Sequence, residues 1–439
     1  MHRRYCFLLL AALSAFGQTQ PEPQLLSWSR QIAIREQWLA KRHEMIPAMM
    51  RRHGVQMWIV VNEEFHKDPL TEFIAPPRPY AGNRDIFVFV DAGEVGFHKI
   101  AITGYAEENL KRFFEAADDP LPQDQALAAL YAKYHPAKIA LSIGGSRGMT
   151  RSLTHDTYIF LAEKMGGDAE NHFVSAADLT EEYLDTRIPE EFDIYTSMVD
   201  LTRILAKRAL SNEVITPGTT TIGDVRRWLY DQLGARGLTT WFQPDLRLQR
   251  RSGTEKKSRG FLAVAPEELV IERGDLLHVD FGFTYMGLNT DWQKMAYVLR
   301  EGETEVPPGL KQALSHTVAL QDTLIEVSRP ERTSSQVYTS LMDRMKQRGI
   351  EAMIYSHPLG NQGHGLGARI DFRSSKADTP EGQKHLRRGS YISVELNTAT
   401  PVAEWDGQKV YVMEEDPAYL TDEGWKFFVP RQEAFYVIH

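Results

Sequence analysis

Four acidic residues in the C-terminal half of this chain lie in or beside apolar segments that read as β-strands, and a histidine stands among them. In chain order the five residues are Asp280, Asp291, His364, Glu395 and Glu415. An apolar strand rarely carries a carboxylate on a buried face without a partner or a metal, because an unpaired buried charge is costly. Carboxylates can bridge two cations, so this set suits a pair of divalent metal ions.

The first two carboxylates are expected to meet in a hairpin. Asp280 ends an apolar run, and residues 295–299 read as its antiparallel partner, with Gly287 near the turn. Folding this hairpin back brings Asp291 beside Asp280. His278 shares the face of Asp280, because side chains alternate between the two faces of a strand.

The remaining candidates come from later in the chain. Glu395 and Glu415 belong to two further predicted strands, 391–396 and 409–415. His364 sits in a Gly-His-Gly-Leu-Gly segment, and glycine allows the backbone to approach a metal or a substrate closely.

The ordered motifs resemble those of the pita-bread metallopeptidases, which include Xaa-Pro aminopeptidases, prolidases, methionine aminopeptidases and the related creatinase. The matching elements are Asp280-x-Gly282-x4-Gly287-x3-Asp291, Gly363-His364-Gly365-x-Gly367, Glu395, Glu415-Asp416 and Leu420-Thr421. The resemblance covers about residues 189–439, and a looser one to the N-terminal domain of prolidases and creatinase covers about residues 30–185.

This resemblance implies a dinuclear metal site. Asp280 and Asp291 would hold one ion, His364 would complete the shell of the other, and Glu395 and Glu415 would be shared. A water between the ions would be the nucleophile, with Glu395 assisting proton transfer. Manganese is favoured because carboxylates dominate the shell, while zinc, cobalt and iron stay open. The resemblance also implies a small peptide substrate and a homodimer.

The chain departs from the family at positions that contact substrate. Residues 252–263 contain no histidine, although the family's peptidases usually carry one before the first Asp strand. Asp371 stands where a second family histidine follows the Gly-His-Gly segment, and Asp291-Trp-Gln-Lys replaces the usual Asp-x-Thr-Arg. Those histidines help to bind substrate and to stabilise the tetrahedral intermediate, so weak cleavage of Xaa-Pro substrates is expected.

Other polar residues near these motifs are candidates to replace the missing histidines. The two leading candidates for substrate binding are His357 and Arg369, and the others are His278 and Arg259.

The leading functional interpretation is an exported metal-dependent peptidase, either an Xaa-Pro aminopeptidase or a prolidase-like dipeptidase. Two alternatives stay open: a metal-dependent hydrolase of another amide or of a phosphoester-like substrate, and a metal-binding family member without turnover. Retention of all five ligand candidates favours a catalytic protein over one without turnover.

The N-terminus predicts export. Residues 1–17 combine His2-Arg3-Arg4 with an apolar run and a small-x-small site at Ala15-Phe16-Gly17, which is typical of a signal peptide. The apolar run is too short to span a bilayer, so a periplasmic or secreted protein without a stable membrane span is expected. The single cysteine, Cys6, lies in this segment, which suits export without disulfide formation.

Composition and pattern indicate the domain organisation. A net charge of −9 argues against nonspecific binding to nucleic acid or acidic membranes. The predicted order is a linker (18–29), an α/β N-terminal domain (30–186) and a pita-bread domain (187–439) with helices on a curved antiparallel sheet, giving an α/β (α+β) fold. In the N-terminal domain, Pro47 is expected to kink or split a helix over 30–53, and residues 73–82 are expected to form an exposed loop.

Overall fold

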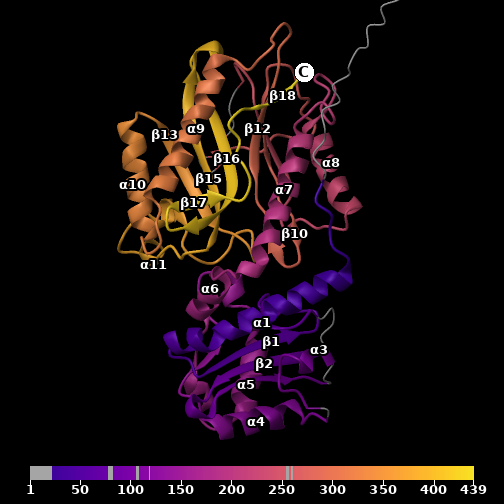
Figure 1. The fold of residues 1–439 in the computed structure, drawn as a ribbon, viewed down its shortest axis with the longest axis vertical. Helices are drawn as coiled ribbons and strands as arrows, with labels where there is room; N and C mark the ends of the chain where they lie inside the picture. Colours follow the sequence, from indigo (N-terminus) through magenta and orange to yellow (C-terminus); the bar gives the residue numbers. More distant parts are fainter. Residues whose placement is uncertain (1–21, 78–82, 105–107, 118, 254–256, 259–260) are drawn as a thin grey trace, which may run out of the picture.

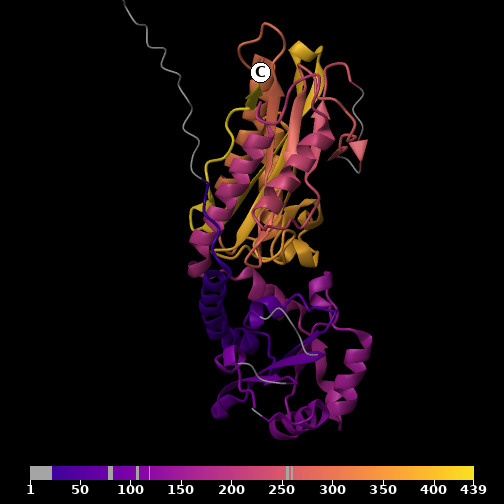
Figure 2. The same ribbon diagram turned by 90° about the vertical axis from the view of Figure 1, so that its right-hand side faces the viewer.

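The computed structural model describes residues 22–77, 83–104, 108–117, 119–253, 257–258 and 261–439. The predicted signal peptide with Cys6, and Arg259, lie outside these residues. The chain forms two domains that are stacked along the long axis, with the N-terminal domain below and the C-terminal domain above (Figures 1 and 2). Across the described residues, every helix is too short or too polar to cross a membrane.

The N-terminal domain is built on a five-stranded sheet in the order β3-β2-β1-β4-β5. Its strands are β1 (Met57–Glu63), β2 (Arg84–Asp91), β3 (Phe97–Ile102), β4 (Ile139–Leu141) and β5 (Phe173–Ser175). Its helices are α1 (Trp28–Arg52), α2 (Thr71–Ile74), α3 (Glu108–Lys111), α4 (Gln123–Tyr134), α5 (His155–Met165) and α6 (Ala177–Asp185).

Both faces of this sheet are covered, which explains the continuous apolar run of β1. Trp58 and Val60 pack into a cluster with residues of α1 and α6, whereas Ile59 and Val61 pack into a cluster with residues of α4 and α5. Because neighbours on a strand face opposite sides, every residue of the run is buried.

Two sequence expectations for this domain are wrong in part. Helix α1 is not split, because it continues through Pro47 to Arg52. Of the segment expected to be an exposed loop, Phe73, Ile74 and Ala75 are buried, since α2 packs its apolar side chains against α1 and β1. Residues 78–82 of that segment lie outside the described residues.

The C-terminal domain contains a nine-stranded sheet with the path β14-β13-β15-β16-β12-β9-β6, and β17 and β18 pair with β16 and β12. Its strands are β6 (Asp245–Gln249), β9 (Leu276–Asp280), β12 (Gln293–Val298), β13 (Glu351–Pro358), β14 (Ile370–Asp371), β15 (Tyr391–Val402), β16 (Gln408–Thr421), β17 (Gly424–Phe427) and β18 (Tyr436–Ile438). Two small hairpins stand outside it: β7 (Lys257–Ser258) with β8 (Phe261–Leu262), and β10 (Thr284–Tyr285) with β11 (Leu288–Asn289).

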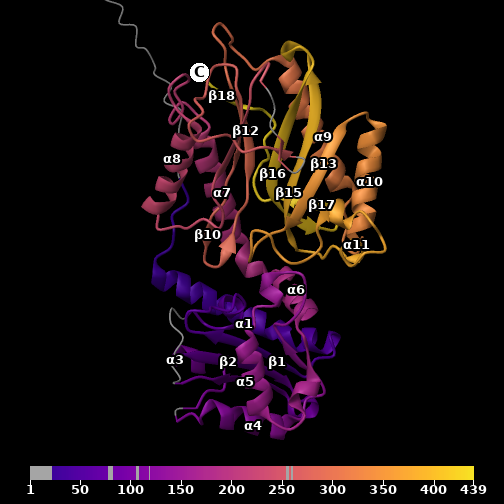
Figure 3. The same ribbon diagram turned by 180° about the vertical axis from the view of Figure 1, so that it is seen from behind.

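Four long helices pack on this curled, mainly antiparallel sheet (Figures 1 and 3), as the sequence predicts. They are α7 (Phe192–Ala209), α8 (Ile222–Ala235), α9 (Pro308–Val327) and α10 (Ser334–Gln347), and the short α11 is Pro380–Gln383. Helix α8 begins at a capping box in which Thr221 and Asp224 bond each other's backbone N–H groups.

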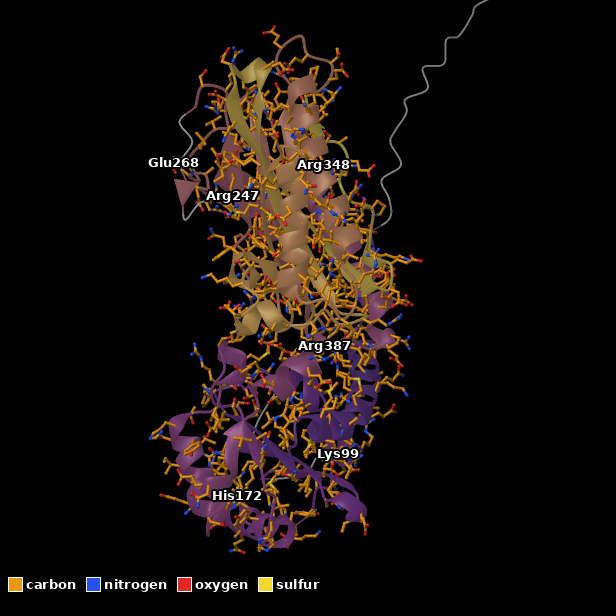
Figure 4. All side chains as sticks on the ribbon, turned by 90° about the vertical axis from the view of Figure 1, so that its left-hand side faces the viewer. Lys99, His172, Arg247, Glu268, Arg348 and Arg387 are labelled. Atoms are coloured by element: carbon orange, nitrogen blue, oxygen red, sulfur yellow. The ribbon has the colours of Figure 1, made fainter. Side chains whose placement is uncertain are left out.

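The two domains meet at the loop 359–367, which contains His364. Leu366 joins the apolar cluster of the N-terminal domain beside Tyr183. Arg387 pairs with Asp185 at the end of α6 (Nε to Oδ2, 3.2 Å), and Figure 4 shows Arg387 at the level where the domains meet. The N-terminal domain therefore supports the histidine loop directly.

Candidate metal centre

Three of the predicted ligands lie in one row across the C-terminal sheet. Asp280 on β9 faces Gln293 on β12, Gln293 faces Glu415 on β16, and Glu415 faces Glu395 on β15. On these strands, the neighbours Val279 and Val394 point instead into the apolar clusters under the helices. Alternation along each strand thus puts the carboxylates together on the other face.

Asp291 joins the row from the segment that links β11 to β12. Carboxylate oxygens of Asp280, Asp291 and Glu415 all lie within 4.8 Å of one another. The turn at Met286 and Gly287, where both residues have positive φ, folds the chain back as the sequence predicts.

Three carboxylate oxygens of the cluster lack compensating donors. Asp280 Oδ1, Asp291 Oδ1 and Glu415 Oε2 are buried and have no hydrogen-bond partner among the residues that the structure describes. Burial, followed by the neighbouring carboxylates, raises the pKa of Asp280 and of Asp291 well above the usual range. Burial and Glu415 raise the pKa of Glu395 to about 7. Unpaired, buried oxygens of this kind fit a site for divalent cations.

His364 stands at the mouth of this cluster. Ligand atoms of His364, His357 and Asp291 lie within 4.8 Å of one another. Burial, and then the neighbouring His357, lowers the pKa of His364 to about 4, so the imidazole is neutral near pH 7, the form that binds metals.

His357 lies inside the cluster, although the sequence pointed to it as a residue for substrate. Its Nε2 atom is 3.4 Å from Glu395 Oε2, 3.5 Å from Glu415 Oε1 and 3.7 Å from Asp291 Oδ2. Burial opposes a charge on this imidazole, but Glu395 and Glu415 outweigh burial and raise its pKa to about 10. The register of β13 against β15 brings it there, because it places His357 opposite Ser393, two residues before Glu395, and no spacing along the sequence signals this pairing.

Three polar side chains hold the glutamates in place. Gln293 Nε2 donates to Glu395 Oε1 (2.5 Å), and Gln293 Oε1 is 2.8 Å from Nε2 of His278. Ser393 Oγ donates to Glu415 Oε1 (2.5 Å). His278, a candidate for substrate contact, is thus fully buried and acts through Gln293.

Lys294 supports the row from behind, at the position where the family has an arginine. Its Nζ is 2.8 Å from Glu414 Oε2, 2.9 Å from Asp416 Oδ1 and 3.0 Å from the backbone oxygen of Glu415. All three side chains of this ion triad are buried. Glu415 lies between the two anions on β16, so Lys294 fixes the strand that carries it.

The position of the second family histidine has a structural role here. Asp371 Oδ1 accepts hydrogen bonds from the backbone N–H groups of Arg373 and Ser374 and caps a short helix. The buried Arg369 faces Asp371 and Glu381 at 3.6 Å each, so its charge is directed toward these carboxylates. Contact between Arg369 and substrate stays a prediction.

Trp241 is a site residue that the sequence did not indicate. Its ring meets His364 edge-on at 5.2 Å between centroids, and its Nε1 donates to the backbone oxygen of Thr290 (2.9 Å). A Cβ atom on Gly363 would come within 2.2 Å of the indole. Trp241 therefore forms an aromatic wall beside the histidine loop.

The fold and the carboxylate cluster define a metal-dependent hydrolase of the pita-bread class. The sequence model described as metallopeptidase family M24 matches residues 204–422. The chain belongs to this family and is a metallopeptidase, as its motifs predict. A search of curated proteins finds no relative by sequence.

Solved structures agree on the fold. The X-Pro aminopeptidase of Thermotoga maritima MSB8 superposes with a TM-score of 0.61 at 15% identity, covering 90% of this chain and 99% of that one. The Xaa-Pro dipeptidase of Bacillus anthracis gives 0.61 at 16% identity, covering 91% and 99%. Zinc-substituted aminopeptidase P of Escherichia coli, in complex with product, gives 0.62 at 13% identity, covering 91% and 96%. These matches extend over both domains.

Proposed function

We propose that this chain is a two-metal peptidase that acts at peptide N-termini or on dipeptides. The observation that carries the proposal is the carboxylate cluster, in which Asp280 Oδ1, Asp291 Oδ1 and Glu415 Oε2 are buried without a hydrogen-bond partner among the described residues. A cluster of this charge and burial is stabilised best by divalent cations.

The proposed ligands are those predicted from the sequence: Asp280, Asp291, His364, Glu395 and Glu415. When bound, the metal ions supply Lewis-acid polarisation of the scissile carbonyl and lower the pKa of water at the site. Glu395 is proposed to accept and return the proton, because its carboxylate is largely buried and its Oε1 is held by Gln293. For these five ligands, of which four are carboxylates and one is an imidazole, manganese is the first candidate, with zinc, cobalt and iron next.

The proposed substrates are short peptides, including Xaa-Pro peptides, by analogy with what the similar solved proteins are named for. Cleavage of Xaa-Pro bonds is expected to be slow. Asp371 is occupied as a helix cap where the family has a histidine, and removal of one donor to a transition state costs about 10²–10³ in kcat. The same departure favours a second candidate, hydrolysis of another amide or a phosphoester-like bond.

Metal analysis and a substrate screen on purified protein test the proposal. After reconstitution with manganese, cobalt or zinc, about two ions per chain are expected, and Asp291→Ala or Glu415→Ala should lose at least one. Hydrolysis of a dipeptide and aminopeptide library should depend on the added metal. A protein that binds no metal, or binds metal without cleaving any library member, contradicts the peptidase assignment.

Glu395→Gln provides the sharper test of chemistry. The amide keeps the volume of the side chain but cannot accept a proton, so kcat should fall by about 10²-fold or more while KM changes little. Glu351→Gln is the matched control, because Glu351 is exposed and pairs with Lys409 away from the cluster. Full activity of Glu395→Gln on a confirmed substrate would show that the catalytic centre lies elsewhere.

We also propose that the protein is exported and forms a homodimer. Export is supported by the charged and apolar N-terminal pattern of the sequence, and N-terminal sequencing of native protein should begin near Gln18. A retained Met1 would contradict export. Light scattering on the purified protein tests the dimer, and a monomer at working concentration would contradict it.

A further inference from the structure

We infer that His357 is itself a metal ligand, so that the centre contains two imidazoles and favours zinc-like ions over manganese. The inference rests on the proposed metal site and adds a ligand that the family motifs do not supply. It concerns the part of the cluster formed by His357, Glu395, Glu415 and Asp291.

The distances are those of ligands around a shared ion. His357 Nε2 lies 3.4, 3.5 and 3.7 Å from three carboxylate oxygens, which is longer than an ordinary hydrogen bond. Zinc binds nitrogen and oxygen at about 2.0–2.2 Å, and two ligands of one tetrahedral ion then lie about 3.4 Å apart. An imidazolium that paired with a carboxylate directly would approach one of them to about 2.8 Å.

The other ring nitrogen fixes the tautomer. His357 Nδ1 is 3.2 Å from the backbone oxygen of Pro358, which can only accept a hydrogen bond. Nδ1 therefore carries a proton, and a metal ion that displaces the second proton, on Nε2, would meet a lone pair that points toward the carboxylates. Metal-binding histidines commonly show this arrangement, in which the second nitrogen donates to a carbonyl or a carboxylate.

The sheet holds His357 in this position. Its partner across β13 and β15 is Ser393, whose hydroxyl group bonds Glu415, and the preceding Ser356 accepts a hydrogen bond from the backbone N–H of Glu395 (3.0 Å). A ligand on a strand is positioned more rigidly than one on a loop. His364 on the loop completes the pair, because the two rings meet edge-on at 4.6 Å between centroids.

Two imidazoles change the expected metal preference. Carboxylate shells suit manganese and magnesium, whereas imidazole suits zinc, copper, iron and nickel. The centre should therefore bind zinc more tightly than manganese. This preference, expressed as the ratio of the two affinities, should be larger than for a carboxylate shell with one histidine.

X-ray absorption of the zinc-loaded protein tests the inference without an activity assay. In the wild-type protein the imidazole signal per zinc should be twice as large as in the His364→Ala variant, and also twice as large as in the His357→Ala variant. Zinc affinity of His357→Ala, measured by competition with a chelator, should fall by about 100-fold. His385→Gln is the control, because His385 is exposed in the same domain, and it should leave the signal and the affinity unchanged.

The wild-type spectrum decides the question even if His357→Ala does not fold. One imidazole per zinc pair, or an unchanged spectrum in a folded His357→Ala protein, overturns the inference and identifies His357 as an ionic partner of the carboxylates. These results leave the proposed peptidase intact. Zinc bound by two imidazoles in a protein that cleaves no peptide would instead refute the proposed function and keep the inference.

Discussion

At the scale of single residues, only glycine fits at position 363, because the indole of Trp241 lies against its backbone. A Cβ atom there would overlap the indole of Trp241, which in turn packs on His364. Gly363→Ala should therefore displace Trp241 and lower the free energy of unfolding by about 1–3 kcal/mol, the usual cost of overpacking. A shift of the tryptophan fluorescence and weaker zinc binding should accompany it.

Gly234→Ala is the matched control for this substitution. Gly234 lies in helix α8, and an added Cβ atom would meet nothing within 4 Å. Alanine is the better helix former, so this change should stabilise the protein by up to about 1 kcal/mol. If Gly363→Ala is equally harmless in urea unfolding and in zinc binding, the wall does not support His364.

His43 gives the N-terminal domain a pH-dependent stability. The ring is buried, its Nε2 is 2.8 Å from the backbone oxygen of Ile74, and its Nδ1 accepts a hydrogen bond from the Lys99 ammonium (3.2 Å). Burial, followed by the charge of Lys99, lowers the pKa of His43 to about 3. The folded protein therefore keeps the ring neutral at pH values where the unfolded chain protonates it.

The sign of this effect is set by proton uptake on unfolding. Because the folded pKa lies below the unfolded value near 6.5, the contribution of His43 is complete above pH 6.5 and is lost as pH falls toward 3. His43→Gln should flatten the fall in unfolding free energy between pH 7 and pH 4, measured by urea titration. An unchanged slope, with His155→Gln on the surface as control, would show that His43 is accessible to protons in the folded state.

At the scale of secondary structure, β12 and β16 are joined beneath the metal centre by a buried ion triad. Lys294 is the cation shared by Glu414 and Asp416, and Gln321 of α9 donates to Asp416 (2.8 Å). Lys294→Met removes the cation and leaves two buried carboxylates unpaired, so the loss of stability should be about 3–5 kcal/mol.

Adding Glu414→Gln to Lys294→Met should restore part of that stability, because one of the two unpaired charges is then neutral. Urea unfolding of the two variants and of the exposed pair variant Lys409→Met provides the comparison. Equal losses for the single and the double variant would contradict the triad as the source of the effect.

The strands of the site could be predicted because their pattern is local. Alternation of apolar residues around Asp280 and Glu395 places these carboxylates on one face, and the structure has the strands that this predicts, although β15 and β16 are longer. The position of His357 could not be predicted, because it depends on the register between β13 and β15 rather than on any spacing along the chain. The burial of Phe73 could not be predicted either, because it depends on tertiary packing: the proline-rich sequence indicates a turn, but Phe73 lies in an apolar cluster with residues of α1.

At the scale of the whole molecule, the N-terminal domain supports the loop that carries His364. Gly367 of this loop packs so closely on Asp185 that a Cβ atom would lie 2.7 Å from the carboxylate, and its φ of +127° also excludes most side chains. Leu366 is buried in the N-terminal core. Movement between the domains would therefore move the histidine loop.

Arg387 is expected to control this contact in a pH-dependent way. Burial raises the pKa of Asp185 to about 6, and the cation of Arg387 at 3.2 Å opposes that rise. Since the folded pKa exceeds the unfolded value of 3.8, Asp185 favours folding at low pH, and this contribution is lost as pH rises through 6. Without Arg387 the pKa of Asp185 in the folded protein rises further, so the protein loses more stability at high pH.

Arg387→Ala should therefore cost about 1 kcal/mol at pH 8, a small value because the arginine is partly exposed, and less at pH 5, where Asp185 is protonated. Amide exchange in residues 359–367 should become faster at pH 8, because the loop loses its ordered neighbour. Asp185→Asn in the same background should remove the difference between the two pH values. Arg388→Ala is the control, since Arg388 pairs with the exposed Asp422, and a similar pH dependence in this variant would show that the effect does not arise at the domain contact.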